Sequence, residues 1–114
     1  MPTKLSTFNL APNAINTGRP NITSVTPMDS TYTTVLSSVS TSGGYIKIVG
    51  INFISNEQVF IRSIGSKGAN LANSITHISS TELRVQLPAS TTGTKMLWVV
   101  NNNGSAAMTT ITYN

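Results

Sequence analysis

His77 is the residue of this sequence best suited to proton transfer, and it is the only histidine. A hydrolytic relay would place it between a nucleophilic hydroxyl and a carboxylate. Asp29, Glu57 and Glu82 are the only side chains that can supply that carboxylate. No nucleophile-elbow sequence is present, and a lone histidine in a Thr- and Ser-rich strand is typical of a surface or hydrogen-bonded residue. We therefore expect no catalytic site.

Metal and phosphate chemistry has little support in the sequence. Three widely spaced carboxylates make a poor site for a hard cation, and the absence of cysteine excludes disulfides and thiolate metal sites. Gly65-Ser66-Lys67-Gly68 contains a lysine but lacks the spacing of a phosphate-binding loop. We expect no metal and no cofactor, and therefore a protein that is not an enzyme.

The composition indicates one all-β domain with few charges. The chain has 114 residues, which is enough to bury a core of its own. Charged residues make up 9% of it, whereas Thr, Ser and Asn together account for 44 residues. Threonine favours strands, while serine and asparagine favour turns. No apolar run approaches the ~20 residues that cross a bilayer, so we expect no membrane segment.

The basic residues do not form a binding patch in the sequence. Seven Lys and Arg against three acids give a net charge of +4, but they are scattered singly. A nucleic-acid binder usually shows a clustered basic stripe with aromatic residues nearby. DNA binding through loops that bear Arg19, Lys67 and Lys95 is therefore the least favoured function, and it would weaken steeply with salt.

Residues 1–19 are predicted to form an extended arm. Pro12 and several asparagines stop any helix from growing there. Such a segment is either a disordered terminus or an arm that docks onto a neighbouring subunit or partner. No continuous apolar core of a secretory signal is present, so we expect a chain made and kept in the cytoplasm unless it leaves with an assembly. The arm carries four sizeable apolar residues: Leu5, Phe8, Leu10 and Ile15.

Period-two alternation predicts seven to eight short strands after the arm, which implies a two-sheet sandwich. A bulge is expected near Thr23-Ser24 because Ile22 and Val25 break the alternation. Gly50 is expected to use backbone angles barred to other residues, so that a bend swings Phe53 over the end of the core. The strands are predicted at residues 20–27, 31–38, 45–50, 57–62, 75–78, 82–87, 95–101 and 106–113.

Several motifs occur in a recognisable order along residues 20–113. They are Pro20-x-Ile22-x-x-Val25-x-Pro27, Gly43-Gly44-x-Ile46-x-Ile48-x-Gly50-x-Asn52-Phe53, Ser80-Thr81-Glu82-Leu83-x-Val85-x-Leu87-Pro88, then Gly93, Leu97-x-Val99-x-Asn101-x-x-Gly104 and Tyr113. This order resembles the IPT/TIG domain, an immunoglobulin-like sandwich, over residues 20–113. We therefore expect residues 20–114 to form one such domain after the arm of residues 1–19. The segment between the first two motifs is longer than usual, which predicts an extra strand or a wide loop.

The resemblance implies a habit of mediating contacts and carries no common active site. Members occur in cell-surface receptors, Rel-type transcription factors, polysaccharide-acting enzymes and virion proteins. In the family pattern Leu97 and Val99 face the core, so the alternate residues of that strand face outward, beside Phe60 and with Tyr45 and Val49. Either the arm or residues 28–42 fold back over them, or they contact another chain. The expected interface residues are Leu5, Phe8, Leu10, Ile15, Phe60, Met96, Trp98 and Val100.

These observations favour a bacteriophage virion component, a capsid decoration (cement) protein made in the host cytoplasm. It would bind the major capsid protein or another virion protein through its arm and its outward apolar strand, with self-association as a further expectation. The alternative is a carbohydrate-binding module for adhesion. That module would need an exposed aromatic platform at Trp98, Phe60 or Tyr45 with asparagine side chains beside it.

Overall fold

Strands form wherever the sequence alternates apolar and polar side chains. The computed structural model describes residues 19–63 and 68–114, so the predicted arm lies outside the described residues apart from Arg19. No helix occurs in this part of the chain. The strands are β2 (Asn21–Met28), β3 (Gly44–Ile51), β4 (Gln58–Ser63), β5 (Asn70–Leu71), β6 (Ser74–Ser79), β7 (Glu82–Leu87), β8 (Gly93–Val100) and β9 (Ala106–Tyr113).

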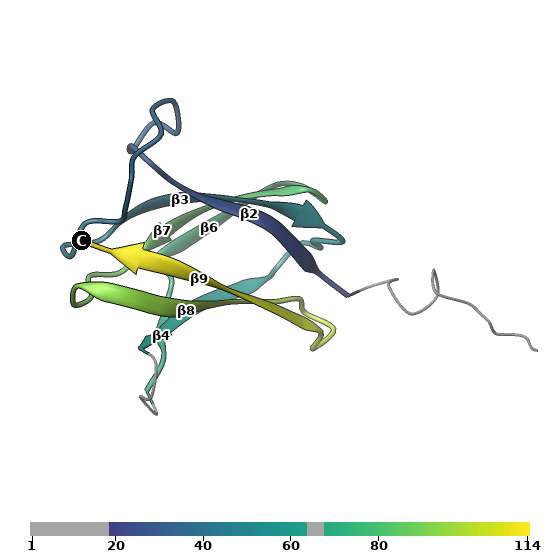
Figure 1. The fold of residues 1–114 in the computed structure, drawn as a ribbon. Helices are drawn as coiled ribbons and strands as arrows, with labels where there is room; N and C mark the ends of the chain where they lie inside the picture. The colour runs from purple at the N-terminus through teal and green to yellow at the C-terminus, as the bar shows by residue number, and fades with distance from the viewer. Residues whose placement is uncertain (1–18, 64–67) are drawn as a thin grey trace, which may run out of the picture.

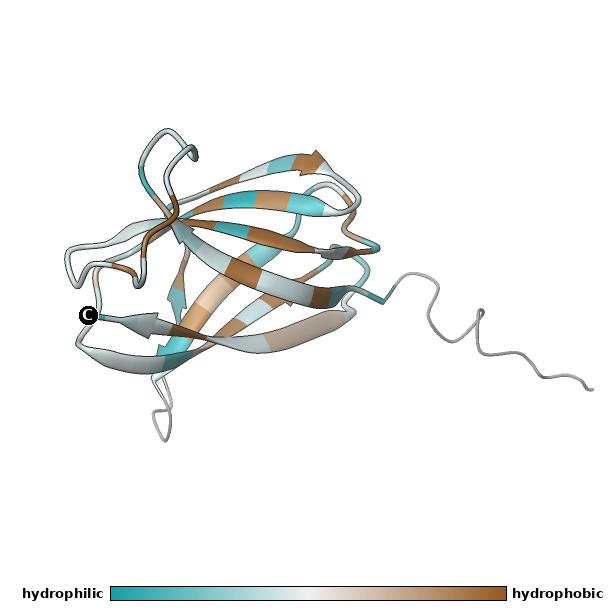
Figure 2. Cartoon of the chain, turned by 45° about the horizontal axis from the view of Figure 1, so that its top comes forward, coloured by the Kyte–Doolittle hydropathy of each residue, from teal (hydrophilic) through white to brown (hydrophobic). Residues whose placement is uncertain are grey.

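The strands make two antiparallel sheets of four that lie face to face (Figure 1). The first sheet has the order β2-β3-β7-β6, and the second has the order β5-β4-β8-β9. Alternating apolar and polar bands along the strands show that each sheet turns one face inward (Figure 2). The sandwich predicted from the sequence is therefore confirmed.

The core lies between the two sheets and takes alternate residues from the central strands. Tyr113 belongs to it, and its hydroxyl donates a hydrogen bond of 2.7 Å to the carbonyl oxygen of Pro88. This bond satisfies the polar end of the largest buried side chain. The core residues are Val39, Ile46, Ile48, Phe53, Val59, Ile61, Leu83, Val85, Leu87, Leu97, Val99, Ile111 and Tyr113.

The first strand follows the prediction, including its irregularity. The register of β2 against β3 shifts between Ile22 and Ser24, which confirms the bulge. β2 is also an edge strand. Proline has no N–H to donate, and an edge strand tolerates Pro27 because only one of its sides is paired.

The strand predicted at residues 31–38 is wrong. The segment between β2 and β3 is a wide loop that touches strands only through isolated bridges, from Val35 to Met28 and from Val39 to Tyr113. The carboxylate of Asp29 accepts hydrogen bonds from the amides of Thr33 and Thr34 at 2.9 and 3.2 Å. Such side-chain bonds turn the backbone away from a strand ladder.

Gly50 is required by space and not by its backbone angles. It is absent from the glycines with positive φ, which in the described residues are Gly43, Gly93 and Gly104. A Cβ at Gly50 would overlap the carbonyl oxygen of Asn21 and would lie 2.8 Å from Cζ of Phe53. The expected placement of Phe53 over the core is confirmed, but the reason is this close approach of β2.

Gly50→Ala is expected to destabilise the protein by about 1–3 kcal/mol or more, because overpacking here pushes on backbone. Gly44→Ala is the matched control, since a Cβ there meets first the side-chain Cγ1 of Val39 at 3.0 Å, which needs to give way by only a few tenths of an ångström. Urea unfolding measures both free energies. Equal losses for the two variants would contradict the close-approach argument.

The loop that Asp29 organises should respond to acid. Hydrogen bonds from the Thr33 amide first, and then from Thr34 and the hydroxyls of Thr31 and Thr33, lower the pKa of Asp29 from 3.8 to about 2. The pKa of Asp29 is therefore lower in the folded than in the unfolded protein. The stabilisation from these bonds is complete above the unfolded pKa and is lost as the pH falls towards 2. NMR titration should show the carboxyl and the Thr33 amide changing together near pH 2. A carboxyl that titrates near 3.8 would contradict this.

Candidate functional site

Four apolar side chains form a continuous row across the outer face of the second sheet. The register places Phe60 opposite both Leu71 and Trp98, and places Trp98 opposite Met108. Paired residues on neighbouring strands point to the same face, and this face is the outer one because the next residue of β8, Leu97, is buried in the core. Leu71 and Met108 are 63% and 48% exposed, and the two aromatic residues between them are half-buried. We call these four residues the outer row.

Two further rows flank the outer row and are also largely uncharged. Met96 is in register with Arg62 and Thr110, and Val100 is in register with Gln58 and Ala106. The sequence-predicted interface residues Phe60, Met96, Trp98 and Val100 therefore share one face. Their role at an interface stays a prediction, and Leu5, Phe8, Leu10 and Ile15 lie outside the described residues.

Sequence reasoning missed Leu71 and Met108. Leu71 belongs to a strand of only two residues, which has no periodicity to read. Met108 alternates with Ala106 and Thr110 in β9, and this pattern indicates its face but not its neighbours. Only the pairing of strands distant in the sequence aligns both residues with Trp98.

The two aromatic rings of the outer row pack against each other. The ring centroids of Phe60 and Trp98 are 6.2 Å apart with an interplanar angle of 16°. The indole Nε1 of Trp98 is buried and has no hydrogen-bond partner among the described residues. Trp98 therefore contributes an apolar surface. No asparagine is in register with this aromatic pair on the described strands, unlike the sugar-binding platform expected for the glycan alternative.

The outer face of the first sheet has a different character. Tyr45 and Val49 lie on β3, so the expectation that they share a sheet with Phe60 is wrong. Tyr32, from the loop between β2 and β3, packs edge-on against Tyr45 at 5.7 Å between centroids. The guanidinium of Arg84 lies 5.3 Å from the Tyr32 ring centroid. The loop of residues 29–43 thus packs on the first sheet and leaves the outer row open.

Polar pairs cover the same face of the first sheet. Arg84 donates a hydrogen bond of 3.0 Å from Nε to Glu82, and Lys47 lies in register with Arg84 on the neighbouring strand. The two outer faces therefore differ in kind, with charges on one and apolar side chains on the other.

His77 is held by a buried carboxylate. Its Nδ1 lies 2.9 Å from Oε2 of Glu57, whose side chain is 1% exposed. Glu57 precedes β4 and His77 belongs to β6, so this contact joins the two sheets. Among the described residues no hydroxyl is hydrogen-bonded to the ring. The arrangement accounts for the histidine as a structural partner.

Lys95 points into the sandwich and not towards a ligand. It is 4% exposed, and its ammonium donates hydrogen bonds to Ser63 Oγ at 3.1 Å and to Thr91 Oγ1 at 2.7 Å. The expectation that Lys95 lies in a DNA-binding loop is therefore wrong. Arg19 is exposed at the start of the described chain, and Lys67 lies outside the described residues.

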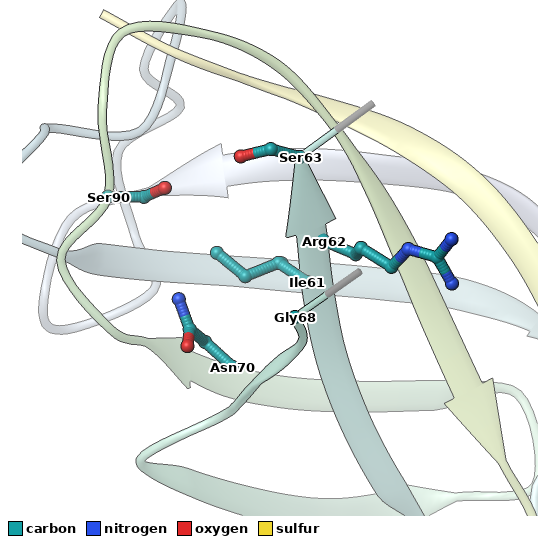
Figure 3. A pocket seen from close by; sticks show the side chains of 6 residues that line it. All are labelled: Ile61, Arg62, Ser63, Gly68, Asn70 and Ser90. Carbon is teal, nitrogen blue, oxygen red and sulfur yellow. The ribbon is translucent and has the colours of Figure 1, made fainter. Parts of the chain in front are cut away.

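A small hollow near the end of β4 offers no chemistry. It measures about 140 Å³ and is lined by Ile61, Arg62, Ser63, Gly68, Asn70 and Ser90. The Arg62 side chain points away from Asn70 and Ser90 (Figure 3). In the part of the chain that the structure describes, no three His or acidic side chains gather as metal ligands. That part also contains no helix of the length and hydrophobicity needed to cross a membrane.

The outer row is expected to be dispensable for folding. Leu71→Lys and Met108→Lys should change the free energy of unfolding by less than about 0.5 kcal/mol, because both side chains are exposed. Leu97 lies on β8 directly before Trp98 but is fully buried. Leu97→Ala should therefore lower the free energy of unfolding by about 2–5 kcal/mol. Urea titrations compare the three. A large loss for either lysine variant would mean that the face is part of the fold's own packing.

The described architecture agrees with a comparison against protein families. The model of the family described as the IPT/TIG domain matches residues 20–113. No curated protein matches the sequence. The match covers both sheets from β2 to β9, so the chain belongs to the IPT/TIG family of immunoglobulin-like domains.

Proposed function

We propose that this chain is a structural protein that binds another protein through the outer row. The observation that carries the proposal is the unbroken apolar line from Leu71 to Met108 across all four strands of one sheet. Exposed apolar patches rimmed by polar side chains mark protein contact sites. Large aromatic side chains such as Trp98 are the residues that contribute most at such sites.

The proposal assigns no catalytic activity to the chain. The IPT/TIG family consists of immunoglobulin-like, non-catalytic interaction domains. The one histidine is engaged by a buried carboxylate, and the buried amine of Lys95 is engaged by two hydroxyls. The groups best suited to proton transfer therefore serve the packing of the sandwich.

The finer proposal is a bacteriophage capsid decoration protein, located on the virion and bound to the major capsid protein or another virion protein. Three features support it. Virion proteins are among the settings in which the family occurs, the chain has only 9% charged residues, and one sheet face presents apolar side chains. An adhesive domain that binds glycans receives less support, because the aromatic pair lacks asparagine neighbours in register.

Particle binding tests the proposal directly. Particles are purified on a density gradient from a culture that produces the protein, and an antibody against the purified chain locates it in the gradient. We expect the chain to sediment with the particles. A chain found only in the soluble fractions at the top of the gradient would contradict the virion proposal.

Variants then test the face. Purified Leu71→Lys is added to particles that lack the chain, beside the wild type and the control Ile78→Lys. Ile78 is 45% exposed and lies on β6 of the other sheet, so both variants add one charge at an exposed apolar site. We expect at least tenfold weaker binding for Leu71→Lys and wild-type binding for Ile78→Lys. Equal binding by all three proteins would refute the role of the outer row.

A further inference from the structure

The edge of β9 is the one sheet edge in the described structure without a feature that blocks strand pairing. β2 carries Pro27 and a bulge, β6 carries a bulge, and β5 has only two residues. β9 runs for eight residues, Ala106–Tyr113, with no proline, no charged side chain and no register shift. Proteins protect their edge strands because unpaired N–H and C=O groups accept any extended chain. Val39 pairs with the C-terminal end of this edge. The remaining length, residues 106–111, is unprotected and indicates a pairing site.

The hydrogen-bonding groups on that edge point outward in a known register. At its C-terminal end, the carbonyl of Thr112 accepts from the Val39 amide at 3.0 Å, and the Asn114 amide donates to the Val39 carbonyl at 2.8 Å. In an antiparallel strand, the N–H and C=O groups of every second residue point to the same side. Thr110 and Met108 therefore direct their amides and carbonyls away from β8, as Thr112 does. These backbone groups have no partner among the described residues.

The chain enters the sandwich beside this edge. Arg19, Pro20, Asn21, Ile22 and Ile51 line a surface hollow of about 320 Å³ together with Ala107 and Met108. The Arg19 carbonyl accepts a hydrogen bond of 3.0 Å from Asn52, and the following proline restricts Arg19 to an extended conformation. The start of β2 lies at the end of the sandwich away from the C-terminus (Figure 1). Residues 1–18 are therefore attached to the chain next to the open edge.

The sequence of the arm contains a segment that fits the edge. Phe8 and Leu10 alternate with Thr7 and Asn9, and Pro12 ends the pattern. In a strand, Phe8 and Leu10 would share one face. We propose that residues 6–11 of a second copy of this chain add to the edge of β9 as a further strand. Phe8 and Leu10 of that copy then prolong the outer row beyond Met108.

Reach and area favour a second copy. Eighteen residues extend up to about 60 Å, which is long enough to reach a neighbouring copy. The four strands of this face have 2, 6, 8 and 8 residues, which at about 3.4 Å by about 4.8 Å per residue cover about 400 Å². Two such faces bury about 800 Å². Stable interfaces bury about 1,200–2,000 Å². An added strand supplies the missing area and main-chain hydrogen bonds as well.

The mass of the full-length chain in solution tests this inference, which concerns self-association and goes beyond the proposed binding to a shell. We expect light scattering to give a multiple of 12.1 kDa for the wild type. Leu10→Asp should reduce the mass to that of the monomer, since it places a charge in the apolar row. Asn9→Asp, on the opposite face of the added strand, is the matched control and should keep the multimer.

A second pair of variants tests the edge itself. Thr110→Pro removes an N–H that points away from β8, so the ladder with β8 remains while strand addition is blocked. Thr110→Val keeps that N–H. We expect a monomer for the first and a multimer for the second, with circular dichroism showing both folded. If Thr110→Pro unfolds, Leu10→Asp decides the question.

Two outcomes would overturn the inference. One is a monomeric wild type, including a monomer whose own arm protects the Thr110 amide from hydrogen exchange. The other is a multimer that survives both Leu10→Asp and a folded Thr110→Pro. Neither of them affects the particle-binding test of Leu71→Lys, because Leu71 lies at the opposite edge of the sheet. The two proposals can therefore fail separately.

Discussion

The alternation of side chains along β8 is the constraint on which this structure depends. Successive residues of a strand point to opposite faces, so burying Leu97 and Val99 at the centre of the core forces the residues between them outward. β8 is apolar on both faces, and a shift of one residue would exchange its inner and outer sets. The neighbouring strands remove that ambiguity, because Val59 and Ile61 of β4 are buried opposite Val99 and Leu97. Trp98 is then left on the outside.

The two sheets use their outer faces differently, and the long loop after β2 shows the contrast. Tyr32 from this loop packs on Tyr45 of the first sheet and lies beneath Arg84. Glu82 completes the polar cover by pairing with Arg84. No described segment covers the second sheet in this way. This contrast between a covered face and an apolar row is what supports the proposed contact through the second sheet.

Membership of the IPT/TIG family explains the architecture but does not specify the function, which depends on surface residues. Functions differ among proteins of one fold because they arise from surface sites carried by a common core. Among the described residues, the buried side chains of Glu57, Lys95 and Asn101 serve the sandwich. Glu57 holds His77 between the sheets, and Asn101 donates a hydrogen bond of 2.9 Å to the carbonyl of Asn52 beside β3. In the described structure, one sheet face and one strand edge are the surfaces on which the two proposals rest.

Local pattern by itself determined most of the strands and turns. The alternation in β3, β7 and β8 and the bulge after Ile22 depend on neighbours in sequence, and each is present where it was predicted. The inner and outer residues of β8 followed from the family pattern and the same periodicity. These features are readable because period, turn chemistry and strand propensity are properties of short segments.

Tertiary structure alone decided which segments meet. Residues 31–38 have the composition of a strand, but a strand needs a partner edge, and Asp29 turns the segment into a loop. Tyr45 lies on the outer face of its own strand, as expected, yet that strand belongs to the other sheet. Lys95 reads as a surface charge until two hydroxyls enclose it. Leu71, Phe60, Trp98 and Met108 form one row only because four strands distant in the sequence are paired in one register, and no local pattern encodes that pairing.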